Sequence, residues 1–182
     1  MAAERSHVGW RLWLWWVLAS TTGLALGFAG GYAAGFAIGG AISGIASQSV
    51  FGAMVGVSFG TTQWLVLRRR VSRAGWWVLA TTLGMGVGFA LVRAMTPTVS
   101  RMVGGGPMYG LVNGAIVGTL IGAMQWLVLR WKVSRAGWWV LASALGMAVG
   151  LALGQVAGQL AGVAMTGIAL VWLLRQPAQE TQ

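Results

Sequence analysis

The sequence contains no cysteine and only two acidic residues, Glu4 and Glu180, among its 182 residues. The lack of cysteine excludes disulfides, thiolate catalysis and the usual zinc or iron–sulfur ligand sets. Proton-coupled carriers, cation-selective rings and two-carboxylate hydrolases each generally need a carboxylate inside the protein, and both carboxylates lie near the chain ends. The only histidine, His7, also lies near the N-terminus. We therefore expect no enzymatic active site, no metal site and no cofactor.

Charged residues of either sign are also scarce. They make up 8% of the chain, against 57% hydrophobic residues and a mean hydropathy of +0.76. A soluble domain carries about 25% charged residues, so this composition predicts an integral membrane protein. The net charge of +10 would raise the question of nucleic acid in a soluble protein. Here the basic residues lie mostly near the ends of apolar segments, which indicates a membrane with an anionic inner surface and no nucleic-acid partner.

An internal repeat organises the chain. Residues 63–80 read QWLVLRRRVSRAGWWVLA and residues 125–142 read QWLVLRWKVSRAGWWVLA, so the two windows differ only at Arg69/Trp131 and Arg70/Lys132. The second half of this unit recurs from Trp15, and a degenerate copy of its first half ends at Arg175. The apolar run from Leu12 could pass for a secretory signal, but it matches two later segments and we expect it to remain as a helix.

The expected fold is an all-α membrane protein, a six-helix transmembrane bundle of duplicated glycine-zipper helical hairpins in one domain over residues 1–182. About 20 apolar residues cross a hydrocarbon core of about 30 Å. The predicted spans are 12–34, 42–67, 75–95, 108–129, 137–155 and 158–174, with repeat units at about 44–95 and 106–157. Residues 136–175 fit two spans joined near Gln155 to Gln159, and a single span there would leave five.

Basic residues predict the orientation. With a cytoplasmic N-terminus, ten of the twelve lie inside: Arg5, Arg11, Arg68, Arg69, Arg70, Arg73, Arg130, Lys132, Arg135 and Arg175. Only Arg93 and Arg101 lie outside. The positive-inside rule then places both termini in the cytoplasm, which agrees with an even number of spans. We expect a bacterial cytoplasmic membrane protein.

Glycine recurs every fourth residue in several spans, and such stripes let helix backbones approach closely in a bilayer. Packing within the bundle is the favoured interpretation, and a free docking face or a pore lining is the alternative. The residues expected to pack helices are Gly23, Gly27, Gly31, Gly52, Gly56, Gly60, Gly114, Gly118, Gly122, Gly146, Gly150 and Gly154.

All twelve tryptophans fall in the inner half of this arrangement, where an indole prefers the headgroup level. Together with the basic loops they predict a face that contacts anionic lipid headgroups or a partner subunit. Its residues are Arg68, Arg69, Arg70, Arg73, Trp76, Trp77, Arg130, Lys132, Arg135, Trp138 and Trp139. The repeated Gln63 and Gln125 precede these loops, and their amides are expected to cap a helix end or to bond across helices.

The repeat, from Trp15 to Arg175, resembles small uncharacterised multi-pass bacterial membrane proteins. This resemblance implies no activity. The favoured function is a non-enzymatic scaffold or accessory subunit that packs with itself, as a homo-oligomer, or with other membrane subunits. The alternative is a small transporter or channel for a neutral or anionic solute, because repeats are frequent in transporters.

Overall fold

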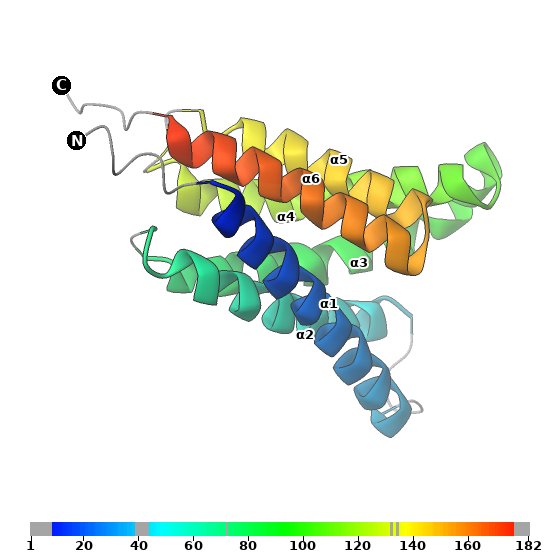
Figure 1. Ribbon diagram of the computed structural model, residues 1–182. Coiled ribbons are helices and arrows are strands. Elements are labelled where there is room, and N and C mark those ends of the chain that lie inside the picture. Colours follow the sequence, from blue (N-terminus) through cyan, green and yellow to red (C-terminus); the bar gives the residue numbers. More distant parts are fainter. Residues whose placement is uncertain (1–8, 39–43, 72, 132, 134, 177–182) are drawn as a thin grey trace, which may run out of the picture.

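The computed structural model describes residues 9–38, 44–71, 73–131, 133 and 135–176. Within these ranges the protein is entirely helical, as predicted (Figure 1). The six helices are α1 (Trp10–Ile38), α2 (Gly44–Leu67), α3 (Gly75–Val103), α4 (Pro107–Leu129), α5 (Trp138–Ala152) and α6 (Gln155–Arg175). Five of them are long and apolar enough to cross a membrane, and α5 is a shorter apolar helix of 15 residues.

Apart from the end of α3, every boundary lies within four residues of the predicted one, and two of the differences bear on the fold. Helix α3 continues to Val103 instead of ending near residue 95, because an apolar stretch can end before its helix does. It stops at Gly104, whose φ of 69° suits glycine. The turn between α5 and α6 lies at Leu153 and Gly154, before the predicted 155–159 segment, because the chain reverses at Gly154 with a φ of 86°.

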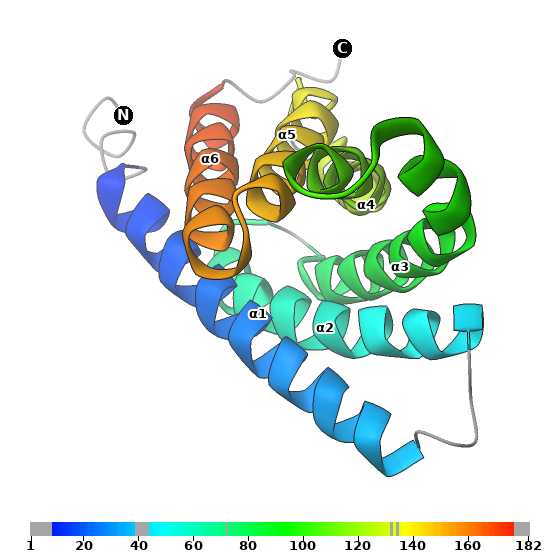
Figure 2. The ribbon, with the colours of Figure 1, turned by 90° about the vertical axis from the view of Figure 1, so that its right-hand side faces the viewer.

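The helices form a closed ring in chain order. Each helix packs against the next one, and α6 returns to pack against α1. Helix α1 runs antiparallel to α6, and the Trp13 Nε1–H donates to the Ala164 carbonyl over 3.0 Å. The N-terminal end of α1 and the C-terminal end of α6 lie at the same end of the bundle (Figure 1), and the C-terminal half of α1 diverges from α6 (Figure 2). Helices α6 and α1 therefore pack as a third pair, which completes the ring with the hairpins α2–α3 and α4–α5. No loop connects α6 to α1, because they are the last and the first helix of the chain.

Glycines allow these helices to approach closely. A Cβ atom added at Gly56 would lie 2.7 Å from the Thr82 Cα, and one at Gly84 would lie 2.7 Å from the Ile121 Cα. Eleven of the twelve glycines predicted to pack helices lie against a neighbouring helix in this way: Gly23, Gly27, Gly31, Gly52, Gly56, Gly60, Gly114, Gly118, Gly122, Gly146 and Gly150. Gly154 is a correction to that prediction, since nothing lies within 4 Å of its added Cβ and it serves the turn instead.

Candidate binding cavity and basic end

Three tryptophans meet on the axis of the ring. Trp16, Trp77 and Trp139 come from α1, α3 and α5, and their ring centroids lie 5.6 to 6.1 Å apart. Each is at most 1% exposed. Trp77 and Trp139 therefore contradict the prediction that they contact lipid or a partner at the inner face, because they fill the core where the three helix pairs converge. This Trp triad closes the bundle axis at the end where α1 begins and α6 ends.

Two buried glutamines, Gln63 and Gln125, form hydrogen bonds between helices beside the triad. This is one of the two alternatives predicted for their amides. The Trp77 Nε1–H donates to Gln63 Oε1 over 2.9 Å, and the Trp139 Nε1–H donates to Gln125 Oε1 over 2.8 Å. Each amide nitrogen then donates to a hydroxyl of the preceding helix pair. Gln63 Nε2 donates to Ser20 Oγ over 3.1 Å, and Gln125 Nε2 donates to Thr81 Oγ1 over 2.8 Å.

The pair α6–α1 breaks this pattern. The Trp16 Nε1–H donates to Thr166 Oγ1 over 3.3 Å, so a threonine accepts the bond that a glutamine accepts in the other two pairs. In the other two pairs the glutamine amide also donates to a hydroxyl of the preceding pair. Thr166 has no amide group, so it cannot donate in this way to Ser143, the corresponding hydroxyl residue of the pair α4–α5. Ser143 is 4% exposed, and among the described residues no hydrogen bond to its hydroxyl is recorded. The buried side-chain atoms that lack a partner in the described residues are Thr21 Oγ1 and Asn113 Oδ1, and Ser143 Oγ is not one of them. Ser143 borders a cavity, where a bound group or water can hydrogen-bond to its hydroxyl.

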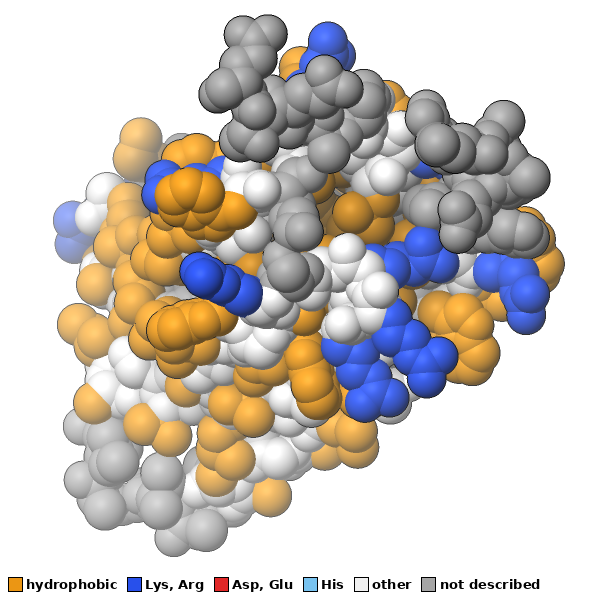
Figure 3. All heavy atoms as spheres, turned by 90° about the vertical axis from the view of Figure 1, so that its left-hand side faces the viewer, with side chains coloured by type: hydrophobic (Ala, Val, Ile, Leu, Met, Phe, Trp, Pro, Cys, Tyr) orange, Lys and Arg blue, Asp and Glu red, His pale blue; other side chains and the backbone are white. Residues whose placement is uncertain are grey.

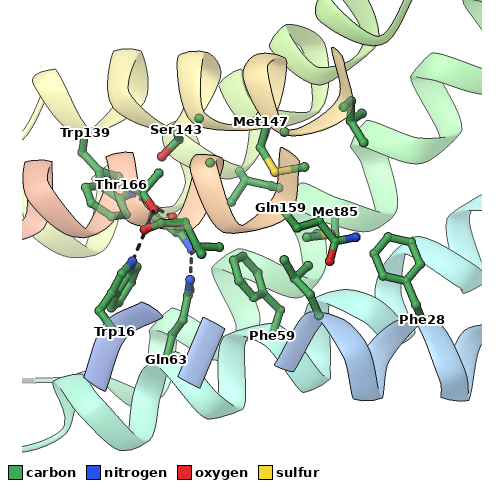
Figure 4. A pocket seen from close by; sticks show the side chains of 18 of the residues that line it. Trp16, Phe28, Phe59, Gln63, Met85, Trp139, Ser143, Met147, Gln159 and Thr166 are labelled. Carbon is green, nitrogen blue, oxygen red and sulfur yellow. Dashed lines mark hydrogen bonds between the residues drawn. The ribbon is translucent and has the colours of Figure 1, made fainter. Parts of the chain in front are cut away.

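A cavity of about 60 Å³ lies at this break in the pattern (Figure 4). Ser143, Thr166 and Gln63 point into it from α5, α6 and α2. The remaining wall of the cavity is mainly apolar and includes Leu24, Phe28, Phe59, Met85, Phe89, Ile121, Met147 and Val163. Gln159 adds a further amide. Because a water molecule needs about 10–15 Å³, this space holds a few waters or the polar end of a small molecule.

Charge is absent from the described lining of the cavity, which consists of apolar side chains, amides, hydroxyls and indoles. An ion would lose its hydration here without an opposite charge to replace it. Trp16 and Trp139 of the triad form one side of the cavity. They separate it from the end of the bundle that carries the arginine-rich loops, here called the basic end. The arrangement can therefore hold an uncharged molecule that has one hydrogen-bonding end.

The basic end displays most of the surface residues predicted from the sequence. Arginine side chains gather there beside exposed hydrophobic ones (Figure 3). The exposed residues of the predicted face are Arg68, Arg69, Arg70, Arg73, Trp76, Arg130, Arg135 and Trp138. Lys132 lies outside the described residues. The guanidinium of Arg68 lies 5.7 Å from the ring centroid of Trp64, and that of Arg130 lies 4.6 Å from the centroid of Trp131, so cation–π contacts order two of these arginines.

Sequence reasoning missed the hydroxyl residues of the cavity network. Ser20, Thr81 and Ser143 each follow a triad tryptophan by four residues, which places them on the same helix face. This shared spacing was the available signal. Thr166 carried no such signal, because its place opposite Trp16 depends on the closure of the ring.

No protein-family model, curated protein or solved structure matches this chain. The apolar helices are those of a multi-pass membrane protein, and the cavity and the basic end are its two candidate functional regions.

Proposed function

We propose that this protein is a non-enzymatic multi-pass membrane protein, with six spans and both termini cytoplasmic, that binds a small uncharged molecule in its central cavity. In this proposal α2–α3 and α4–α5 are duplicated hairpins, and α6–α1 is the divergent third pair that creates the site. The observation that carries the proposal is the Ser143 hydroxyl, which borders the cavity next to Thr166 and makes no hydrogen bond to another described residue.

The accessory-subunit role receives less support from the geometry. It relied in part on the glycine stripes, and a partner could use such a stripe only if it remained free as a docking face. Gly23 and Gly27 approach α2, Gly56 approaches α3, and Gly118 approaches α5. These stripes are occupied by helices of the same chain, so a partner subunit would have to bind another surface. The cavity therefore favours the solute-binding alternative, with the cytoplasmic side closed by the Trp triad.

The ligand class follows from the lining. Gln63, Gln125, Ser143 and Thr166 offer donors and acceptors at one end, and the remaining walls are mainly apolar. A short-chain alcohol, amide or ketone matches this arrangement, since it carries one polar group on an apolar body. Anions and cations do not match it, because no charged side chain lies in the described lining.

Replacing Thr166 with glutamine tests the proposal. The longer amide is expected to reach Ser143, to reproduce the bond that Gln125 makes to Thr81, and to fill the cavity. We expect Thr166→Gln to abolish saturable binding of an n-alkanol probe, and to leave thermal stability unchanged or raised by about 1 kcal/mol. Binding is measured by the shift in melting temperature of the purified protein across a butanol-to-octanol series.

The control is Thr98→Gln, the same change at an exposed position of α3. It is expected to bind the alkanols as the unchanged protein does. Equal, saturable binding by the Thr166→Gln variant would refute the proposal, as would a purely linear response in the unchanged protein. Flux of the bound alkanol into liposomes that contain only this protein would extend binding to transport. Stoichiometric co-purification of another subunit, without alkanol binding, would instead favour the accessory role.

A further inference from the structure

Three grooves at the basic end occupy matching places around the ring. They lie between α1 and α2, between α3 and α4, and between α5 and α6. Each has a tryptophan at the matching place on its wall, namely Trp15, Trp76 and Trp138, with exposures of 60%, 60% and 57%. A leucine follows each tryptophan by three residues: Leu18, Leu79 and Leu141. The grooves thus share an apolar wall and differ mainly in the residues around it.

Their charge differs sharply. The α1/α2 groove is lined by four arginines: Arg11, Arg68, Arg69 and Arg70. Among the described residues, the α3/α4 groove has only Arg73 and the α5/α6 groove has only Arg135. The volumes of the three grooves are about 690, 750 and 380 Å³. The α1/α2 groove therefore combines a large apolar space with the densest positive charge.

The described part of the chain provides no neutralising charge for these four arginines. It contains no aspartate and no glutamate, since Glu4 and Glu180 lie outside it. Guanidinium groups pair with phosphate through two parallel hydrogen bonds, so a cluster of four suits a ligand with more than one phosphate. The ligand must also cover Trp15, Leu18 and Leu65, which are exposed along the same groove.

We propose that the α1/α2 groove is a specific site for one anionic phospholipid with two phosphates. The arginines bind the headgroup, and an acyl chain lies along Trp15, Leu18 and Leu65. A lipid fits better than a soluble polyphosphate because one molecule satisfies both the charge and the apolar wall. It fits better than a protein partner because the groove opens on a surface that faces lipid in a multi-pass protein. This site is separate from the central cavity and does not depend on the function proposed for that cavity.

The test uses the full chain in nanodiscs of phosphatidylcholine with a minor fraction of cardiolipin. The variant is the triple replacement of Arg68, Arg69 and Arg70 by glutamine. We expect native mass spectrometry to detect one retained cardiolipin on the unchanged protein, and a roughly hundredfold weaker retention on the variant. Raised salt is expected to weaken retention in the unchanged protein.

Two controls keep the result interpretable. The double variant Arg93→Gln/Arg101→Gln removes exposed arginines at the opposite end of α3, and Arg73→Gln removes the single arginine of the α3/α4 groove. Both are expected to retain cardiolipin. A circular dichroism melt confirms that each variant is folded, and single replacements at 68, 69 and 70 substitute for a triple variant that does not fold.

Three outcomes would overturn the proposal. The first is equal cardiolipin retention by the triple variant and the unchanged protein. The second is displacement of cardiolipin by inorganic pyrophosphate at equal concentration, which would indicate an anion site without acyl-chain recognition. The third is loss of a co-purifying subunit, with no change in lipid, on replacement of the arginines.

Discussion

At the residue scale, neighbouring tryptophans in one motif have opposite environments. Trp76 is 60% exposed beside a groove, whereas Trp77 is fully buried and donates a hydrogen bond to Gln63. Adjacent helical residues point about 100° apart, so one faces outward and the other faces the axis. The same division holds for Trp138 and Trp139. A repeated pair of tryptophans thus supplies both an outer belt and a central triad.

This division predicts unequal effects for the same substitution. Trp77→Phe removes the bond to Gln63 Oε1 and leaves that buried oxygen with only the 3.5 Å contact from Gln125 Nε2. We expect it to lower the free energy of unfolding by about 1–3 kcal/mol. Trp76→Phe should change it by less than about 0.5 kcal/mol. Denaturant unfolding in mixed micelles measures both, and equal losses would contradict the buried network.

At the scale of the helices, the side chain added at a glycine decides whether two elements fit. A Cβ on Gly118 would lie 2.8 Å from the Ala144 Cα in α5, so α4 and α5 would have to separate. Gly137 also has a helical φ, of −59°, but nothing lies within 4 Å of its added Cβ. A comparison of these two positions distinguishes the role of glycine in helix packing from the effect of its backbone flexibility.

Alanine at the two positions should therefore act in opposite directions. Gly118→Ala is expected to destabilise the protein by about 1–3 kcal/mol, because overpacking displaces a helix. Gly137→Ala is expected to be neutral or to stabilise it by up to about 1 kcal/mol, since alanine restricts the unfolded chain. Melting temperatures of the purified variants test this. A harmless Gly118→Ala would show that α4 and α5 do not meet closely.

At the scale of the whole molecule, the ring brings the start of α1, the end of α6 and both repeated loops to one end, with the α3–α4 turn at the other. The orientation of that axis in a membrane remains a prediction from the distribution of arginine and lysine. Positions suited to testing it are glycines where a new side chain meets nothing within 4 Å, namely Gly75, Gly105 and Gly137.

Single cysteines at these glycines report the orientation, because the chain has no other cysteine. We expect an impermeant thiol reagent added to intact cells to label Gly105→Cys, and to label Gly75→Cys or Gly137→Cys only after lysis. Val71 and Val133 lie in the same loops but are buried, so they are poor reporters. Labelling of position 75 or 137 from outside would reverse the proposed orientation.

The sequence by itself determined the helical class, the six helices and most of their bounds. Apolar stretches, glycine spacing and short basic loops are local properties that a linear pattern records directly. The close approach at Gly56 and Gly118 was predictable for the same reason, since a stripe on one helix needs a neighbour.

Only the tertiary structure decided how the chain closes. Three tryptophans separated by about 60 residues meet because α6 packs against α1, and no local pattern encodes that contact. The closure places Thr166 where the other pairs have Gln63 and Gln125, which leaves Ser143 beside a cavity without a hydrogen bond to another described residue. The candidate site thus arises because the third helix pair has a threonine where its two neighbours have a glutamine. A mismatch of this kind exists only once all three pairs surround one axis.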